Sequence, residues 1–456
     1  MRGFLAARAR RRCRPDGPAP AFGTFVAAAS AAGRLVVQPR MGFGDPARMR
    51  DGLARTRAAT ARTAGTLTVD SYTRVGDLAT ARAAVADGTR LNGYPIAAHG
   101  PDTTRGVLDG LHGPDFPVQV RHGSARPEPI VRALAAAGLD ATEGGPVSYC
   151  LPYGRTPLRD SVAAWARACE LLATGARPGA VPHLESFGGC LLGQLCPPGL
   201  LVAMSVLECL FFTRYGLRSV SLSYAQQTDA GQDEEALRAL HRLAGEFLPR
   251  DVDHHVVLYT YMGVYPRTEQ GATRLLEASA RLAVRSGAGR LIVKTAAEAH
   301  RIPTVEENVR ALETAAAAAA LAGPAAPGTG TGEDGEIYQE ARTLVETVLG
   351  LHPDLSRALT AAFARGLLDV PFCLHPDNAG RSLGCIDSGG RLRWARTGAM
   401  PLRADAAAGA APLTSSGLLG ALNHVADRYD SPRRDDTGTE HGDGRHDRPP
   451  ATPLPV

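Results

Sequence analysis

Short β-rich runs alternate with amphipathic helical segments from residue 33 onward, and this alternation constrains the fold of the chain more than any other feature. Strands that alternate with helices of this length are typical of parallel βαβ units. Two of the helical segments span residues 233–248 and 269–286. The clearest strand runs are LVVQP at 35–39, TLTVDS at 66–71, PVQVRHG at 117–123, SVSLSY at 219–224, HHVVLYTYMG at 254–263 and RLIVKTA at 290–296.

Less regular runs at 94–99, 142–149 and 181–187 bring the candidate strands to eight or nine. That number favours a closed (β/α)8 TIM barrel over an open six-stranded sheet, and it requires one of the runs to be a loop. We therefore expect an α/β chain in five segments. These are a basic N-terminal extension (1–32), a barrel catalytic domain (33–313), a low-complexity linker (314–336), a smaller C-terminal lobe (337–428) and a disordered, charged tail (429–456).

Composition excludes several classes of protein. The formal charge is only +4, from 50 basic and 46 acidic residues, and no basic stripe follows the first 14 residues, so we expect no nucleic-acid partner. The sequence contains no run of 18 apolar residues, so it predicts no membrane span. The eight cysteines form no C-x-x-C pair, which indicates reduced thiols in a cytoplasmic protein. Among the basic residues Lys294 is the only lysine, which makes it a candidate for a position that arginine cannot fill.

In a barrel, ligands bind at the carboxyl ends of the strands, so the residues that follow each run are informative. Arg40, Arg74 and Arg121 follow successive runs, and Glu143 follows the next one. A single arginine is more commonly a solvated charge, but three that converge on one mouth favour a carboxylate or phosphate ligand. No P-loop or G-x-G-x-x-G turn accompanies them. Since Glu143 could accept an ammonium group, the residues predict an enzyme acting on a small dicarboxylic substrate.

Other candidates are less specific. Tyr149 and Tyr153 are four residues apart, and Pro152 between them favours a loop over the site rather than a helix interior. The D-V-D-H-H run at 251–255 lacks the spacing of a helical zinc site, so we interpret it as structural and predict no metal site. Cys190 and Cys196 are interpreted as core thiols.

A series of motifs, in order along the chain, resembles the large (epsilon) chain of adenosylcobalamin-dependent glutamate mutase, also called methylaspartate mutase. The resemblance covers roughly residues 33–405. The motifs are QPRMG at 38–42, DSYTR at 70–74, LNGYP at 91–95, VQVRHG at 118–123, EGGPVSYCLPY at 143–153, LESFG at 184–188, YMGVYP at 261–266, IVKTAAEAHRIPT at 292–304, GLLDVPF at 366–372 and NAG at 378–380.

The resemblance implies a (β/α)8 barrel that interconverts L-glutamate and (2S,3S)-3-methylaspartate by a radical mechanism. The family's substrate contacts and pocket residues fall at Arg40, Arg74, Arg121, His122, Glu143, Tyr149, Tyr153, Glu185 and Phe187. Its adenosylcobalamin contacts fall at Gly42, Asn92, Pro152, Tyr265, Lys294, Glu298 and Ile302.

The resemblance also implies a partner, because this chain lacks the D-x-H-x-x-G motif of cobalamin-binding modules. We expect a separate small cobalamin-binding (sigma) subunit that shares the cofactor, in a heterotetramer of two large and two small chains. Two residues depart from the family pattern. Arg290 stands where a second lysine is common, which could alter how the cofactor is held, and Tyr265 stands where phenylalanine is common.

Two alternatives remain open at the level of sequence. A lysine in a barrel strand also suits a Schiff-base aldolase, with Lys294 as the nucleophile. A non-catalytic paralogue with a degraded site is the other alternative, although Arg40, Arg74, Arg121 and Glu143 are all retained.

Overall fold

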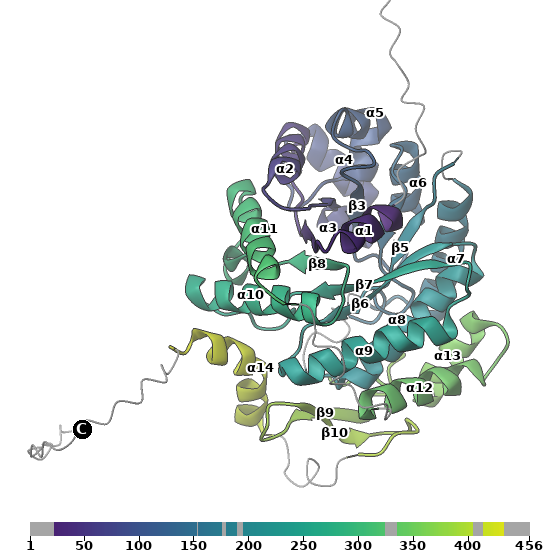
Figure 1. Cartoon of the computed structure of the whole chain (residues 1–456). Helices are drawn as coiled ribbons and strands as arrows, with labels where there is room; N and C mark the ends of the chain where they lie inside the picture. The colour runs from purple at the N-terminus through teal and green to yellow at the C-terminus, as the bar shows by residue number, and fades with distance from the viewer. Residues whose placement is uncertain are drawn as a thin grey trace, which may run out of the picture.

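The computed structural model describes residues 22–152, 154–175, 179–188, 195–323, 335–404 and 414–432. Eight parallel strands form one sheet in the order β1-β8-β7-β6-β5-β4-β3-β2, and helices surround it (Figure 1). The strands are β1 (Val36–Pro39), β2 (Gly65–Thr68), β3 (Val118–Arg121), β4 (Ala141–Glu143), β5 (His183–Glu185), β6 (Ser219–Ala225), β7 (Asp253–Tyr259) and β8 (Arg290–Val293).

The sheet curves into a nearly closed barrel. Its two edge strands, β1 and β2, meet at one parallel bridge between Val37 and Thr63, where the Val37 amide donates to the Arg62 carbonyl over 2.9 Å. The predicted (β/α)8 barrel is therefore confirmed. One candidate run is not a strand: Ile96 begins helix α5 (Ile96–Leu108), and only Tyr94 makes a bridge to the sheet. Helix α5 has a kink at Gly100, and after the kink the buried residues Thr104, Val107 and Leu108 follow helical spacing.

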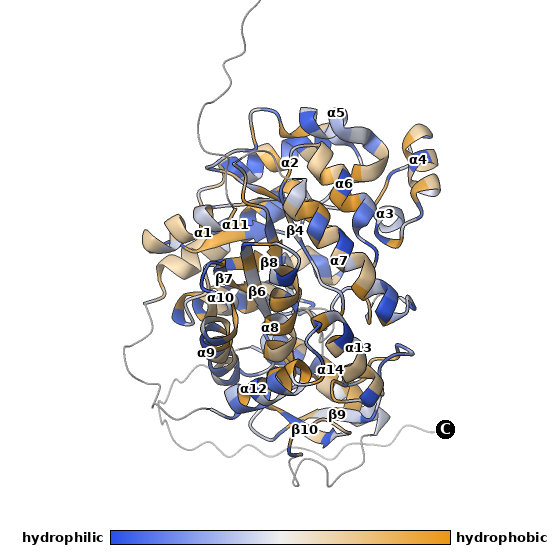
Figure 2. Ribbon diagram, turned by 90° about the vertical axis from the view of Figure 1, so that its right-hand side faces the viewer, coloured by the Kyte–Doolittle hydropathy of each residue, from blue (hydrophilic) through white to orange (hydrophobic). Residues whose placement is uncertain are grey.

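Helices connect the strands and cover the outside of the barrel. Helix α8 is buried along almost its whole length because the barrel lies on one side and the C-terminal lobe on the other, and Figure 2 shows it mostly tan and orange. The barrel helices are α2 (Pro46–Ala58), α3 (Ser71–Val75), α4 (Leu78–Ala86), α5, α6 (Glu128–Ala136), α7 (Leu158–Thr174), α8 (Pro198–Arg214), α9 (Ala230–Phe247), α10 (Glu269–Arg285), the 3-10 turn η1 (Ala296–Ala299) and α11 (Val305–Ala320).

An additional helix, α1 (Phe22–Ala31), packs at the amino end of the barrel. We expected residues 1–32 to form a basic N-terminal extension; within that range, Phe22, Phe25, Val26 and Ala29 of α1 are buried. Their spacing produces one apolar helical face. The Phe22 ring stacks on His183 with centroids 5.1 Å apart, so this part of the expected extension belongs to the barrel.

The C-terminal lobe packs on the barrel through α12, which contacts α8 and α9. Helix α11 continues through Ala320, past the boundary expected at residue 313. The remainder of the expected linker, from 324 to 334, and the tail from 433 lie outside the described residues. The lobe contains α12 (Glu336–Leu349), α13 (Leu355–Arg365), the antiparallel pair β9 (Ser382–Ile386) and β10 (Leu392–Thr397), and α14 (Ser415–Asp430).

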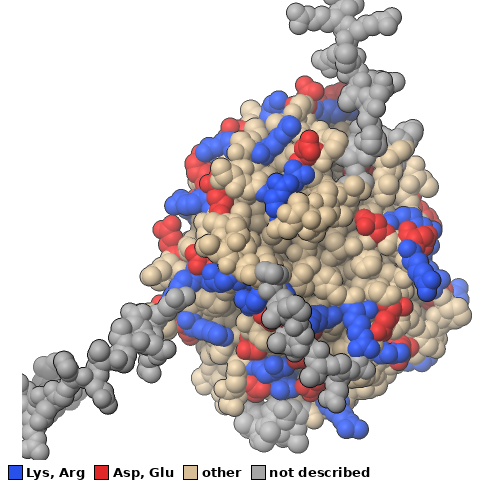
Figure 3. Space-filling model, viewed as in Figure 1, with Lys and Arg blue, Asp and Glu red and all other residues tan. Residues whose placement is uncertain are grey.

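The surface carries acidic and basic side chains interspersed across the face shown in Figure 3. Within the described ranges, no helix combines the length and apolar character needed to cross a membrane.

Candidate active site

A cavity of ≈ 300 Å³ opens at the carboxyl end of the barrel strands. It brings together eleven of the residues selected from the sequence. They lie at the carboxyl ends of β3 and β4 or in the segments that follow β1, β2, β3, β4, β5 and β8. These residues are Arg40, Gly42, Arg74, Asn92, Arg121, His122, Glu143, Tyr149, Phe187, Glu298 and Ile302. Because parallel strands end at the same edge of the barrel, residues distant in sequence share one mouth.

A buried ion pair occupies the centre of this cavity. The side chains of Arg121, at the end of β3, and Glu143, at the end of β4, are only 4% and 2% exposed. Arg121 Nη2 lies 2.9 Å from Glu143 Oε2. Burial alone would lower the pKa of Arg121, but Glu143 and neighbouring acidic groups raise it above its ordinary value, so the guanidinium stays charged.

Glu143 is held by more than its ion pair. The Tyr149 hydroxyl donates to Glu143 Oε1, and the Tyr259 hydroxyl lies 3.0 Å from Glu143 Oε2. Burial raises the pKa of Glu143, while Arg121 and the two hydroxyls oppose that shift. The carboxyl group is therefore a hydrogen-bond acceptor whose charge depends on the groups around it.

The turn that carries Tyr149 requires two glycines. Gly144 has a φ of +124°, and a Cβ there would lie 2.3 Å from the Tyr149 ring. A Cβ on Gly145 would lie 2.1 Å from the carboxyl carbon of Glu208 on α8. The Glu208 carboxylate accepts hydrogen bonds from the amides of Val147 (3.1 Å) and Ser148 (2.8 Å), and it thereby fixes the turn that directs Tyr149 at Glu143.

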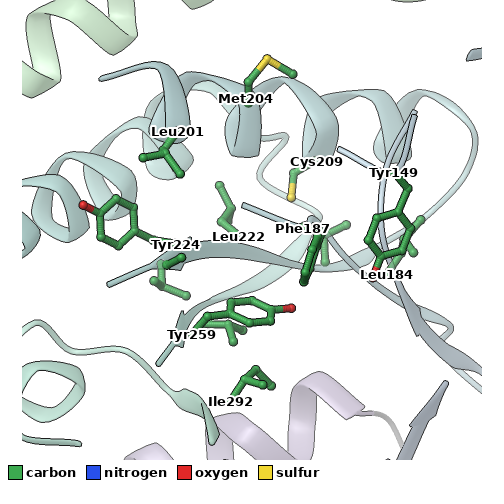
Figure 4. Packing of buried hydrophobic residues seen from close by; sticks show 14 of the residues in the cluster. Tyr149, Leu184, Phe187, Leu201, Met204, Cys209, Leu222, Tyr224, Tyr259 and Ile292 are labelled. Atoms are coloured by element: carbon green, nitrogen blue, oxygen red, sulfur yellow. The ribbon is translucent and has the colours of Figure 1, made fainter. Parts of the chain in front are cut away.

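Aromatic rings form one wall of the cavity. The Phe187 ring contacts Tyr149 and Tyr259 at centroid distances of 4.9 and 5.1 Å, and the Tyr149 and Phe187 rings lie next to each other in Figure 4. His122 stacks on Trp165 with centroids 5.6 Å apart. These rings provide an apolar, water-poor environment for the charged pair.

His122 is neutral in this environment. Burial, and then the charge of Arg121, lower its pKa to about 3. Its Nδ1 lies 3.0 Å from the amide of Ser124 and accepts that hydrogen, which places the ring hydrogen on Nε2. Nε2 has no protein partner within the described part of the chain, so it can donate to a ligand in the cavity.

Nearer the rim, Arg40 Nη1 lies 2.8 Å from Glu298 Oε2, and the Arg40 side chain is 30% exposed. Glu298 also accepts the amide hydrogen of Thr295 at 3.0 Å, which fixes the start of η1. The Asn92 side chain accepts a hydrogen bond from the Ser71 amide at 3.1 Å. These contacts orient the side chains of Arg40 and Asn92 at the mouth of the cavity before a ligand binds.

Lys294 and Tyr265 lie next to this mouth. The Lys294 ammonium is 4.0 Å from the centroid of the Tyr265 ring, and both residues are buried. Lys294 lines a neighbouring cavity of ≈ 360 Å³ between α10, η1 and α11 rather than the cavity of Arg121. Pro152 lines a third cavity, of ≈ 760 Å³, with residues of the C-terminal lobe, and Tyr153 lies outside the described residues.

Glu185 lies beneath the cavity, where Arg290 and Tyr259 both donate to its carboxylate. Arg290 is fully buried at the amino-terminal end of β8 and also donates to Gln38. The sequence left open whether Arg290 alters how the cofactor is held. Arg290 begins β8, at the opposite end of the strand from Lys294, and is enclosed in the barrel. The Glu185 carboxylate compensates the charge of Arg290, which explains how a cation is accommodated at this buried position.

Three residues near the site were not selected from the sequence: Tyr259, Glu208 and Trp165. Tyr259 is the last residue of β7, but the predicted run continued to residue 263, so Tyr259 did not stand out as a strand end. Glu208 and Trp165 lie inside helices, and their sequence patterns contain no signal of their contact with the site.

The chain resembles known proteins over most of its length. Residues 18–411 match the family described as methylaspartate mutase E chain (MutE). The chain is 32% identical to the glutamate mutase epsilon subunit of Halobacterium salinarum over 345 residues, which are 74% of this chain and 71% of that protein. The epsilon subunits of Desulfitobacterium hafniense (32% over 348 residues, 73% and 71%) and Escherichia coli O157:H7 (30% over 353 residues, 74% and 72%) are similar to the same extent.

Proposed function

Because this chain belongs to the methylaspartate mutase E chain family, we propose that it is the catalytic subunit of an isomerase that interconverts L-glutamate and (2S,3S)-3-methylaspartate with adenosylcobalamin. The observation that carries the proposal is the buried pair of Arg121 and Glu143 in a cavity that also holds Arg40 and Arg74. This set of charges is complementary to a ligand with two carboxylates and one ammonium group.

In the proposed complex, both substrate carboxylates bind the guanidinium groups of Arg40, Arg74 and Arg121, and the ammonium binds Glu143. Without ligand, Glu298 and Glu143 neutralise Arg40 and Arg121. A substrate carboxylate replaces these internal partners, so binding does not require new charges to be buried without compensation. His122 Nε2 supplies a neutral donor beside the arginines.

The residues at the rim fit a large cofactor. The cavity extends from Glu143 to Gly42, Asn92 and Ile302, and the apolar Ile302 side chain is 58% exposed. The buried hydroxyl of Tyr265 has no hydrogen-bond partner among the described residues. Gly42, Asn92, Tyr265, Lys294, Glu298 and Ile302 would hold the adenosyl face of the cofactor, which supplies the radical chemistry when it is bound.

The chain itself supplies binding and orientation. A carbon-skeleton rearrangement breaks one carbon–carbon bond of the substrate and forms another, so the two parts must stay aligned between these events. Guanidinium forks that hold each carboxylate at two points restrict rotation and translation. The wall of Phe187, Tyr149 and Tyr259 excludes water from reactive species. Arg121 and Glu143 are well suited to this task because their partners already fix them.

We further propose that a small cobalamin-binding subunit covers the mouth, in a cytoplasmic assembly of two large and two small chains. The epsilon designation of the relatives supports a multi-subunit enzyme. The absence of D-x-H-x-x-G from the sequence supports a separate chain for the lower face of the cofactor.

Of the two alternatives, the aldolase is not favoured by the structure. A Schiff-base lysine must reach the substrate. Lys294 lies against Tyr265 and lines a different cavity from Arg121 and Glu143. Borohydride reduction in the presence of a carbonyl substrate would trap an adduct on an aldolase, and we expect none here.

The test is to purify this chain together with a small cobalamin-binding subunit, add adenosylcobalamin and L-glutamate, and measure 3-methylaspartate. We expect product only when the cofactor and both chains are present. Glu143→Gln, which retains the shape of the side chain but not its charge, should lose most of the product. If a partner subunit that is active with another large chain gives no cofactor-dependent product here, the proposal is wrong, and the non-catalytic paralogue is then supported.

A further inference from the structure

Beneath the cavity, the hydroxyl of Tyr259 lies between two buried carboxyl groups. It is 3.0 Å from Glu143 Oε2 and also contacts Glu185 Oε1. Tyr259 and Glu185 are fully buried, and Glu143 is nearly so. Figure 4 shows the Tyr259 ring between Phe187 and Ile292, with its hydroxyl pointing toward the side of Tyr149.

A phenol has one hydrogen, so Tyr259 can donate to only one of these carboxyl groups at a time. Glu185 has other donors on its Oε2: Arg290, Gln119 at 3.2 Å and Ser221 at 3.3 Å. Glu185 therefore keeps hydrogen-bond donors on Oε2 whichever way the Tyr259 hydroxyl turns. Among the described residues, the neighbours of Glu143 Oε2 are Arg121 and Tyr259.

We propose that Tyr259 is a positioning residue that couples the protonation of Glu143 to substrate binding by turning its hydroxyl hydrogen between Glu185 and Glu143. When Glu143 is protonated, its O–H donates to Tyr259, and Tyr259 donates to Glu185. When Glu143 releases its proton to water in the open cavity, Tyr259 donates to Glu143 instead. The inference rests on the proposed binding of the substrate ammonium at Glu143.

The charged and titratable groups around Glu143 agree with this role. Arg121 faces it from β3, Tyr149 from the following turn and Tyr259 from β7, while Glu185 on β5 pairs with it in strand register. Farther away, His122 is neutral and Arg290 is neutralised by Glu185. Burial raises the pKa of Glu143, and the hydrogen bond from Tyr259 is one of the contacts that lower it.

The direction of the pH effect follows from these contacts. An ammonium group binds the ionised form of Glu143, so affinity should rise as the pH rises through the pKa of this carboxyl. Removing the Tyr259 hydroxyl removes a donor to the ionised form, and Glu143 then keeps its proton to higher pH. A shift of about one pH unit corresponds to about tenfold weaker binding below the transition.

The chain contains a matched control. Tyr224 is also fully buried and its hydroxyl donates to a carboxylate, Asp233 Oδ1, at 2.7 Å. Figure 4 shows the Tyr224 hydroxyl pointing away from Tyr259 and Tyr149. Tyr224→Phe therefore removes the same kind of bond without touching the cavity.

The experiment is calorimetric titration of L-glutamate into the full chain, as wild type, Tyr259→Phe and Tyr224→Phe, from pH 6 to 9. We expect Tyr259→Phe to bind about tenfold more weakly at the lower pH values and to approach the wild-type affinity about one pH unit higher. Tyr224→Phe should follow the wild-type curve. Should Tyr259→Phe fail to fold, 3-fluorotyrosine at position 259, a stronger donor of the same shape, should move the curve toward lower pH.

Two results would overturn the inference. The curve of Tyr259→Phe could superimpose on that of the wild type, or its affinity could fall by the same factor at every pH, as a purely structural role would require. If wild type and Tyr224→Phe bind no glutamate at any pH, the proposed binding of the substrate by this chain fails instead, so the two failures are distinguishable.

Discussion

Arg121 and Glu143 form an ion pair across the carboxyl ends of β3 and β4, with Arg121 Nη2 2.9 Å from Glu143 Oε2 and both side chains almost completely buried. A buried pair of this kind contributes little net stability compared with an apolar pair, but loss of one partner leaves the other charge uncompensated. The pair is therefore better explained by ligand binding than by the stability of the fold.

Arg121→Lys should weaken the binding of L-glutamate by about 10- to 100-fold and leave the fold intact. Lysine retains a positive charge near Glu143 but replaces the planar fork with a point charge, which cannot hold a carboxylate at two points. Substrate saturation curves and thermal melts would measure both effects. Arg218→Lys, at an exposed pair with Asp251, is the control and should change neither. Unchanged saturation by Arg121→Lys would contradict the role of Arg121.

Gly145→Ala should abolish most of the activity and destabilise the chain by about 1–3 kcal/mol. The added Cβ would lie 2.1 Å from the Glu208 carboxyl carbon, so either the turn carrying Tyr149 or the α8 side chain must move. Gly106→Ala in α5 is the control, because no atom lies within 4 Å of a Cβ added there. The two variants should differ in chemical denaturation and in turnover, and equal behaviour would argue against a rigid turn.

Tyr265→Phe should stabilise the free chain by about 1 kcal/mol. Its buried hydroxyl has no partner among the described residues, so removing it relieves a desolvated polar group. The ring and its contact with the Lys294 ammonium are retained. Tyr94→Phe should have the opposite effect, because the Tyr94 hydroxyl is 3.0 Å from Thr104 Oγ1. Urea denaturation of both variants provides the comparison; destabilisation of Tyr265→Phe would mean that its hydroxyl is satisfied in solution.

Glu208 should make the free energy of unfolding depend on pH near neutrality. Burial raises its pKa to about 7 from an ordinary value of 4.5. Because the folded-state pKa is raised, the stabilisation that Glu208 contributes to the folded state is present below about pH 4.5. It is lost as the pH rises toward 7, and the free energy of unfolding then falls by on the order of a few kcal/mol. Glu208→Gln is neutral throughout and should flatten the curve between pH 5 and 7.

This flattening should be partial. Burial also raises the pKa of Asp233 and of Glu340 to about 7, and both remain in the variant. Denaturation at a series of pH values measures the slopes, and identical slopes for wild type and Glu208→Gln would show that Glu208 titrates normally.

The periodic part of the fold was accessible from sequence because period-two and helical patterns of apolar residues specify local structure. The runs at 35–39, 117–123 and 290–296 contain the strands β1, β3 and β8, which end at Pro39, Arg121 and Val293. The run at 94–99 was misleading because a few apolar residues cannot distinguish a short strand from the first turn of a helix. Helix α1 was missed because its apolar face follows an arginine-rich segment.

The sequence by itself determined the barrel, the strand ends near which Arg40, Arg121 and Glu143 stand, and the family; Arg74 lies in helix α3, which follows β2. Those features depend on local periodicity and on ordered motifs. Only the tertiary structure decided which charges pair: Arg121 with Glu143 in the cavity, and Arg290 with Glu185 beneath it. It also placed Tyr259 between the two carboxyl groups. Such pairings arise where closure of the barrel brings inward-facing side chains of several strands into one layer. The pattern of residues along a single strand does not encode which side chains of the other strands share its layer.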